Sequence, residues 1–377
     1  MFWNCSCWDL PIIQLTQPWR PLAMQYMAIT RLSLTDFRNH TAISLLPTSQ
    51  FVALYGANGA GKTNILEAIS LLVPGRGLRR AGLIEMARTG GSGGFAVTAE
   101  IGDVMLGTGV DADTPERRKV RINGANATIN GLAEWLSIIW LTPSMDRLFA
   151  DGASARRRFL DRLVLALEPA HAQASNRYEK AVQQRNKLLG GDSMPDPVWL
   201  DALEAQMAES GAAIVEARQR MMKALVVQLD AAPAGPFAVP DIRIDSEMQP
   251  NSEVLRLIWK KSRRLDAGAG RTLEGPHRID LVVHNRSNGQ AADRCSTGEQ
   301  KALLLSLILA HAALVADQRG TPPILLLDEV AAHLDPPRRA ALFERLAATG
   351  AQVWMTGTEA ALFNEIGPTA ELIAVGA

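Results

Sequence analysis

The chain has 377 residues, of which 47% are apolar and 21% charged, and its 39 basic side chains balance 39 acidic ones. This composition is typical of a globular protein of about two or three domains and excludes a disordered chain. Because the net charge is zero, any contact with nucleic acid must come from local basic clusters rather than from a global field.

The cysteines and the first residues bear on the compartment. Cys5, Cys7 and Cys295 are too few for a disulfide framework or a four-cysteine zinc site, which favours a reduced, cytoplasmic setting. The apolar runs fall short of the ~20 residues that a membrane span needs, so we expect no membrane contact. Residues 1–26 lack the charge and apolar order of a signal peptide. We expect them to be an atypical extension, arising from an upstream start site.

Apolar periodicity predicts strands at both ends of the chain and helices in the middle. The predicted strands are, in chain order, residues 28–38, 43–46, 51–55, 96–101, 104–110, 120–122, 138–141, 281–284, 324–327, 353–355 and 372–375. The predicted helices are residues 64–72, 154–189, 199–229 and 299–315, followed by a helix that Asp335 caps and Pro336 begins. A stretch rich in proline and glycine, residues 233–240, interrupts the helical middle. The pattern therefore predicts an α/β domain in two parts, residues 27–150 and 278–377, with a helical arm over residues 151–277.

A phosphate-binding loop follows the third predicted strand. Its residues, which fit G-x-x-x-x-G-K-[ST], are Gly56, Ala57, Asn58, Gly59, Ala60, Gly61, Lys62 and Thr63. The glycines let backbone N–H groups surround a phosphate at a helix N-terminus. Lys62 is expected to reach the β- and γ-phosphates, and the Thr63 hydroxyl to ligate Mg²⁺. The sequence thus predicts an ATP site with Mg²⁺.

An acidic pair ends the predicted strand 324–327. Asp328 and Glu329 follow four apolar residues, and a parallel sheet presents such carboxylates at the edge where ligands bind. We expect Asp328 to hold Mg²⁺. We expect Glu329 to orient and deprotonate the attacking water, which makes Glu329 and Lys62 the candidate catalytic residues.

A third motif lies between these two. Residues 296–301 read Ser-Thr-Gly-Glu-Gln-Lys and open a long helix that Ser296 or Thr297 can cap. This looks like the signature motif of ABC-type ATPases, in which Ser296, Gly298 and Glu299 of one subunit would meet the nucleotide of the other. Asp335 matches the position of that family's D-loop. Thr356 occupies the switch position, from which its hydroxyl can bond the γ-phosphate.

More widely, the chain resembles the RecF family of bacterial recombinational-repair ATPases, which are relatives of the SMC proteins. The segments that carry the resemblance are residues 34–40, 56–64, 156–161, 184–186, 275–278, 296–301 and 327–329. The resemblance covers residues 27–377, adds Asn64 to the nucleotide site and implies an ABC-type P-loop ATPase head with an inserted helical arm. The chain departs from the family pattern at Thr142–Ser144, near the expected glutamine loop, and at Ile279.

The resemblance also implies a function. Proteins of this family bind ATP, dimerise on it, hydrolyse it slowly as a DNA-stimulated switch, and bind single- and double-stranded DNA at gaps. Together with RecO and RecR they help to load RecA. We therefore expect an ATP-dependent homodimer, with hydrolysis through Glu329 releasing DNA.

Basic clusters are the candidate DNA contacts. Of four clusters in the chain, we favour Arg76, Arg79 and Arg80, just beyond the first predicted helix of the head. Because no aromatic residues alternate with them, we expect contacts to the DNA backbone.

Two other functions stay open at this point. A structural chromosome protein of the SMC type would need a long coiled coil, for which the interval between Lys62 and Ser296 is too short. A transporter ATPase would need a membrane partner and usually a histidine at the switch position.

Overall fold

The computed structural model describes residues 28–191, 195–233, 235–246, 248 and 251–376, so the expectation for residues 1–26 lies outside the described part. Contacts within the chain define two compact units. Unit 1 is Met1–Met145, Ala234–Phe237 and Ile308–Ala377, and unit 2 is Asp146–Pro233 and Ala238–Leu307.

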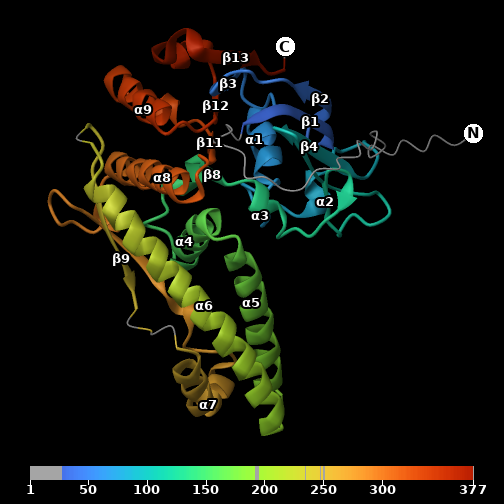
Figure 1. Cartoon of the computed structure of the whole chain (residues 1–377), viewed down its shortest axis with the longest axis vertical. Helices are drawn as coiled ribbons and strands as arrows, with labels where there is room; N and C mark the ends of the chain where they lie inside the picture. Colours follow the sequence, from blue (N-terminus) through green and yellow to red (C-terminus); the bar gives the residue numbers. More distant parts are fainter. Residues whose placement is uncertain (1–27, 192–194, 234, 247, 249–250, 377) are drawn as a thin grey trace, which may run out of the picture. The chain divides into compact units, whose positions relative to one another are not determined.

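Unit 1 contains two β-sheets (Figure 1). The antiparallel sheet has the order β2-β1-β4-β5-β6-β7 and consists of β1 (Ile29–Phe37), β2 (His40–Leu45), β4 (Phe95–Ile101), β5 (Val104–Val110), β6 (Lys119–Ile122) and β7 (Ala125–Asn126). The parallel sheet has the order β13-β3-β12-β11-β8 and consists of β3 (Phe51–Tyr55), β8 (Ile138–Leu141), β11 (Ile324–Leu327), β12 (Val353–Gly357) and β13 (Ala370–Ala374). Strand β12 therefore lies between β3 and β11, the strands that precede the phosphate loop and the acidic pair.

The helix α1 connects the two sheets of unit 1. It contacts β1, β4 and β12, and its apolar residues Ile65, Leu66 and Ile69 belong to one core with residues of both sheets. The continuous apolar runs of β3 and β11 are buried, as parallel strands covered on both faces require. The helices of unit 1 are α1 (Lys62–Ser70), α2 (Leu83–Met86), α3 (Leu132–Trp135) and α9 (Pro336–Ala348), with 3₁₀ turns at Pro143–Met145, Ala331–His333 and Ala360–Thr369.

The boundary between the units falls inside the helix α8 (Thr297–Arg319). Among the described helices, α8 alone is long and apolar enough to cross a membrane by length and composition. However, 78% of its most apolar window is buried in the protein, as in the core helix of a globular domain.

Unit 2 consists mainly of helices, with one antiparallel strand pair (Figure 1). Its elements are α4 (Ala153–Leu167), α5 (Ala170–Leu189), α6 (Pro197–Asp230), β9 (Pro240–Asp245), α7 (Ser252–Ala269) and β10 (Asp280–Asn285), with 3₁₀ turns at Pro276–Arg278 and Ala292–Arg294. The helices α5, α6 and α7 share an apolar core that contains Tyr178, Met207, Ile214 and the fully buried Trp259.

A buried ionic layer, which we define as Arg185, Glu204 and Asp266, lies across α5, α6 and α7. All three side chains are 0% exposed. The Arg185 guanidinium donates to Glu204 Oε1 at 3.0 Å and to Asp266 Oδ2 at 2.7 Å, and to the carbonyl of Trp259 at 2.9 Å. The charges and hydrogen-bonding groups of the layer are thus matched within the protein.

Three features of unit 2 differ from the sequence-based expectations. The helix predicted over residues 154–189 is in fact two, because Glu168 adopts an extended conformation before Pro169, which disfavours a helical residue ahead of it. The strand β9 begins at the end of the segment expected to be a linker. Helix α7 was not predicted, although Leu255 and Trp259 lie buried one turn apart on it, beside the polar Ser262 and Asp266.

The division into domains at residues 150 and 277 stays a prediction. The two compact units are defined by contacts and not by domain boundaries, and unit 2 extends through β10 into the first turns of α8.

Candidate nucleotide-binding site

The phosphate loop joins β3 to α1 in unit 1. Gly56, Gly59 and Gly61 have φ values of 147°, 84° and 103°, a region that favours glycine. A Cβ at Gly61 would lie 2.5 Å from the ring of His40, and one at Gly56 would lie 2.5 Å from the carbonyl oxygen of Val375. The loop therefore depends on glycine both for its backbone angles and for its close packing.

Lys62 lies within this loop. Its side chain is buried, and its ammonium donates to the carbonyls of Gly56 at 2.7 Å and Ala57 at 2.8 Å. The charge is thus held at the concave side of the loop, where backbone N–H groups and the N-terminus of α1 also favour an anion. This arrangement suits a bound phosphate.

Two residues of the predicted metal site meet in the structure. The Thr63 hydroxyl donates to Asp328 Oδ1 at 2.8 Å, although the residues are far apart in sequence. Asp328 is buried at the carboxyl end of β11. No three His, Cys, Asp or Glu side chains cluster as a metal site within the described ranges. The hydroxyl and the carboxylate nevertheless suit Mg²⁺, which commonly takes one or two protein oxygens and completes its shell with water and nucleotide phosphates.

Thr356 lies beside this pair, because β12 separates β3 from β11. Its hydroxyl donates to Asp328 Oδ1 at 2.8 Å and accepts the N–H of Glu329 at 2.9 Å. Glu329 has a φ of 54°, an unusual value for a residue with a side chain. Thr356 was expected to bond the γ-phosphate, but here its one proton goes to Asp328. Its hydroxyl bridges the two acidic residues.

Residues after β1 support the loop, a contribution that the sequence analysis did not assign. Asn39 donates its amide to the carbonyl of Ala60 at 3.2 Å and accepts from the Asn64 amide at 2.7 Å. The His40 ring bonds the carbonyl of Gly61 at 3.1 Å. The signal for this role was present in the segment 34–40, which the resemblance had singled out.

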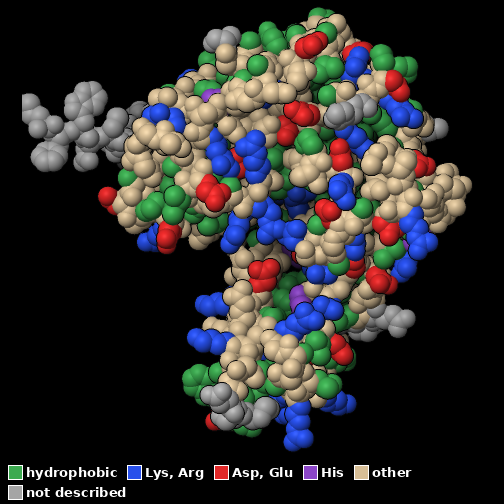
Figure 2. Space-filling model, turned by 180° about the vertical axis from the view of Figure 1, so that it is seen from behind, with side chains coloured by type: hydrophobic (Ala, Val, Ile, Leu, Met, Phe, Trp, Pro, Cys, Tyr) green, Lys and Arg blue, Asp and Glu red, His purple; other side chains and the backbone are tan. Residues whose placement is uncertain are grey.

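The three arginines favoured for DNA binding are exposed, but Arg79 and Arg80 both interact with other residues of the protein. Arg79 donates to the Asn64 side chain at 2.6 Å and to the fully buried Glu67 at 3.2 Å. Glu67 also accepts two hydrogen bonds of 2.8 Å from Arg38. Arg79 therefore belongs in part to the support of α1, and the DNA role of Arg76, Arg79 and Arg80 stays a prediction. Figure 2 shows groups of Lys and Arg side chains among acidic ones, in keeping with a net charge of zero.

The predicted signature motif is an exposed helix cap in unit 2. The Ser296 hydroxyl donates to Glu299 Oε2 at 2.7 Å, the Ser296 N–H donates to the same oxygen at 2.9 Å, and the Glu299 N–H donates back to the hydroxyl at 3.3 Å. These bonds lower the pKa of Glu299. Ser296 and Gly298 are exposed, and a Cβ at Gly298 would meet nothing within 4 Å. A capping box with an open approach is thus present.

Asp335 caps α9 in unit 1, as expected. Its side chain accepts the N–H of Arg338 at 2.9 Å. The departure from the family pattern at residues 142–144 forms a local contact, with 2.9 Å between the hydroxyls of Thr142 and Ser144.

Known proteins are similar to this chain over most of its length. The family model described as "RecF/RecN/SMC N terminal domain" matches residues 28–375. The chain is 48% identical over 363 residues to the "DNA replication and repair protein RecF" of Mesorhizobium japonicum, covering 92% of this chain and 96% of that protein. It is 47% identical over 371 residues to the protein of the same name from Rhizobium johnstonii, covering 93% and 97%.

Solved structures show the same fold. The structure of "the recombination mediator protein RecF-ATPrS in RecFOR pathway" matches with a TM-score of 0.79 at 22% identity, covering 94% of this chain and 98% of that one. An Smc head domain from Pyrococcus furiosus matches with a TM-score of 0.50 at 18% identity, covering 92% of each chain. The predicted fold, an ABC-type P-loop ATPase head with an inserted helical arm, is confirmed. The chain belongs to the RecF family of DNA replication and repair proteins.

Proposed function

We propose that this RecF-family protein is an ATP-gated DNA-binding switch, with ATP bound at Gly56–Asn64 together with Mg²⁺ held by Thr63 and Asp328. The observation that carries the proposal is the bridge from Thr63 through Asp328 and Thr356 to Glu329, which connects the phosphate loop to the acidic pair. The solved relatives described as RecF-ATP and RecF-ATPrS support the choice of nucleotide.

Each residue has a definite task in this proposal. Lys62 and the loop N–H groups bind the phosphates, and Glu329 holds the attacking water and takes its proton. A bound Mg²⁺ would neutralise phosphate charge as a Lewis acid. Thr356 positions Glu329 through the backbone rather than by contact with the nucleotide. Hydrolysis is slow and serves to end the bound state.

The site is completed by a second copy of the chain. Ser296, Gly298 and Glu299 of one protomer cover the ATP held by its partner, and Asp335 couples the two sites. The exposed capping box supports this arrangement, since a helix N-terminus with free approach is suited to the negative charge of a γ-phosphate.

DNA and protein partners follow from the family. Arg76, Arg79 and Arg80 contact the backbone of single- or double-stranded DNA at gaps when the dimer closes. The "RecFOR pathway" of the solved relative supports RecR and RecO as partners, with RecA loading as the outcome. The setting is cytoplasmic.

Light scattering with and without ATP, and with and without gapped DNA, tests the proposal. We expect a monomer without nucleotide, a dimer with ATP, and a long-lived dimer for Glu329→Gln because hydrolysis is blocked. Lys62→Ala is the matched negative control, since it removes the phosphate contact and should stay monomeric. A Glu329→Gln protein that binds ATP and yet stays monomeric would contradict the dimer.

A further inference from the structure

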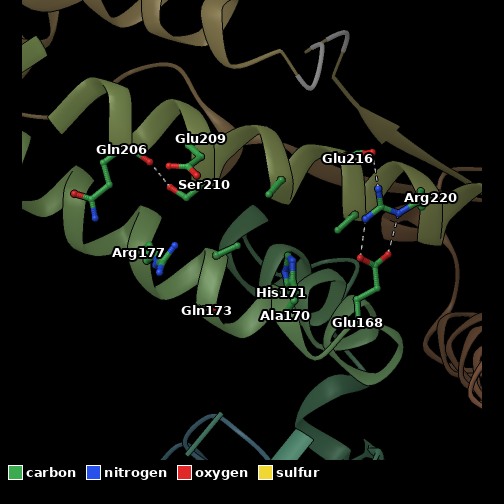
Figure 3. Close-up of a pocket in the computed structure, with 13 residues that line it drawn as sticks. Glu168, Ala170, His171, Gln173, Arg177, Gln206, Glu209, Ser210, Glu216 and Arg220 are labelled. Atoms are coloured by element: carbon green, nitrogen blue, oxygen red, sulfur yellow. Dashed lines mark hydrogen bonds and ion pairs between the residues drawn. The ribbon is translucent and has the colours of Figure 1, made fainter. Parts of the chain in front are cut away.

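Unit 2 contains two polar cavities that the nucleotide site does not use. One, of about 340 Å³, lies between α5 and α6 (Figure 3). It is lined by two basic residues, Arg177 and Arg220, and by three acidic ones, Glu168, Glu209 and Glu216. Arg220 is paired with Glu168 and Glu216 at 2.7 Å. Because acidic groups outnumber basic ones there, this cavity does not favour an anion.

The second cavity, which we call the Arg157 pocket, is different in charge. It has a volume of about 270 Å³ and is lined by residues of α4, α5, α6 and the 3₁₀ turn at Pro276–Arg278, among them Arg157, Arg218, Ser175, Tyr178 and His277. The guanidinium of Arg157 is half-buried and makes no hydrogen bond or ion pair within the described part of the chain.

Burial and neighbouring positive charges disfavour the charged form of Arg157. Burial lowers the pKa of Arg157; Asp280 acts against this, while the like charges of Arg278, Arg218 and Arg156 lower the pKa further. Arg156 is held by Asp280 at 2.7 Å and Arg218 by Asp161 at 2.7 Å, so those two are compensated. A half-buried cation without a partner beside other cations is unfavourable unless an anion neutralises it.

The remaining groups of the pocket leave the arginine available. Tyr178 and His277 bond each other at 2.7 Å, and His277 Nε2 lies 3.0 Å from the carbonyl of Thr272, to which it must donate. His277 Nδ1 then accepts the Tyr178 proton, so the ring is neutral. Burial first, and then the charges of Arg278 and Arg157, lower the pKa of His277, in agreement with this tautomer. Ser175 makes no side-chain hydrogen bond among the described residues.

We propose that the Arg157 pocket binds a phosphate group, with Arg157 as its forked donor and Ser175 beside it. Arg278 does not line the pocket, but its positive charge acts on Arg157. Planar guanidinium groups bind phosphate through two parallel hydrogen bonds, and the pocket offers such a group without a competing partner. Two acidic residues line the same pocket: Asp161, which is paired with Arg218, and Glu179, which has an interaction of its own. The phosphate comes either from a DNA backbone or from free phosphate in solution, and both sources share the chemistry that Arg157 recognises. The DNA source rests on the proposed function, whereas the free source does not.

The first arm of the test measures DNA. Fluorescence anisotropy of a labelled oligonucleotide is followed over a series of salt concentrations for the parent, Arg157→Ala and Arg157→Lys. Loss of one phosphate contact should weaken binding about tenfold or more and reduce the salt slope by about 0.7–0.9. Arg157→Lys keeps the charge but loses the fork and should fall between. The matched control is Arg177→Ala, which removes an exposed arginine from the first cavity and should leave the slope unchanged.

The second arm uses inorganic phosphate and follows thermal unfolding, because a ligand of the folded state raises its stability. Lys62→Ala removes the contribution of the phosphate loop. A stabilisation that survives Lys62→Ala but is lost in Arg157→Ala assigns the pocket to free phosphate, and a change in the DNA arm alone assigns it to nucleic acid. If neither arm responds to Arg157→Ala or to Arg278→Ala, the pocket is not a phosphate site. Failure of the parent itself to bind DNA would instead count against the proposed function.

Discussion

Replacing Thr356 with valine removes the hydroxyl that bridges Asp328 and Glu329 while keeping nearly the same shape. Thr356 is 1% exposed, so water cannot take over its hydrogen bonds. The change removes a hydrogen bond to a carboxylate, worth about 1.5–3 kcal/mol, and leaves the buried N–H of Glu329 without its acceptor. We expect the free energy of unfolding to fall by about 2–3 kcal/mol. If the same amount is lost in holding Glu329 during hydrolysis, kcat falls by about 30- to 150-fold.

The assay is steady-state ATP hydrolysis together with denaturant unfolding. Because the Thr356 hydroxyl bonds Asp328 and the N–H of Glu329, we expect it to position Glu329, so kcat should fall while KM changes little. Thr356→Ser retains the hydroxyl and should restore most of the lost rate. The reasoning is refuted if Thr356→Val raises KM with kcat unchanged, which would mean that the hydroxyl binds the γ-phosphate instead. Equal rates for the valine and serine variants would also contradict it.

Two further predictions concern unit 2. Arg185→Met leaves the buried Asp266 without its cation, whereas Glu204 keeps its ion pair with Arg263, and the change should lower the free energy of unfolding by about 3–5 kcal/mol in a urea titration. The exposed Arg264→Met should change it by less than about 0.5 kcal/mol, and similar values for both would rule out a stabilising role for the layer. Burial acts to raise the pKa of Asp161, but hydrogen bonds from His171 and Arg218 hold it below its usual value. That carboxylate therefore stabilises the fold above its unfolded pKa of about 3.9, and this stability is lost as the pH falls through the lower folded pKa. Asp161→Asn should be less stable than the parent at pH 7, with the gap closing towards pH 3, and a gap that stays constant with pH would refute the assignment.

The parts of the site that depend on local sequence were predictable. A phosphate loop needs its glycines, Lys62 and Thr63 in one short segment, and the acidic pair needs only an apolar strand before it. The contact between Thr63 of the loop and Asp328 of the acidic pair was also expected, because parallel sheets bind ligands at the edge where the strands end. The bridge made by Thr356 did not follow, because it depends on β12 lying between β3 and β11, and strand order is not written in any local pattern.

The helices of unit 2 also differ in how far the sequence predicts them. Pro169 marks a helix boundary by its chemistry, so the division between α4 and α5 was within reach of sequence reasoning. Helix α7 was not predicted. Its buried Asp266 bonds Ser262 on the same helix and Arg185 on α5, and the second partner becomes visible only in the folded structure.

The ionic layer of Arg185, Glu204 and Asp266 also has a mechanical consequence. Sliding one of its three helices by a turn would separate the buried Arg185 guanidinium from its carboxylates, which costs more free energy than a similar shift between apolar side chains. The three helices should therefore move as one stiff block, and their amide protons near the layer should be among the slowest in unit 2 to exchange with solvent.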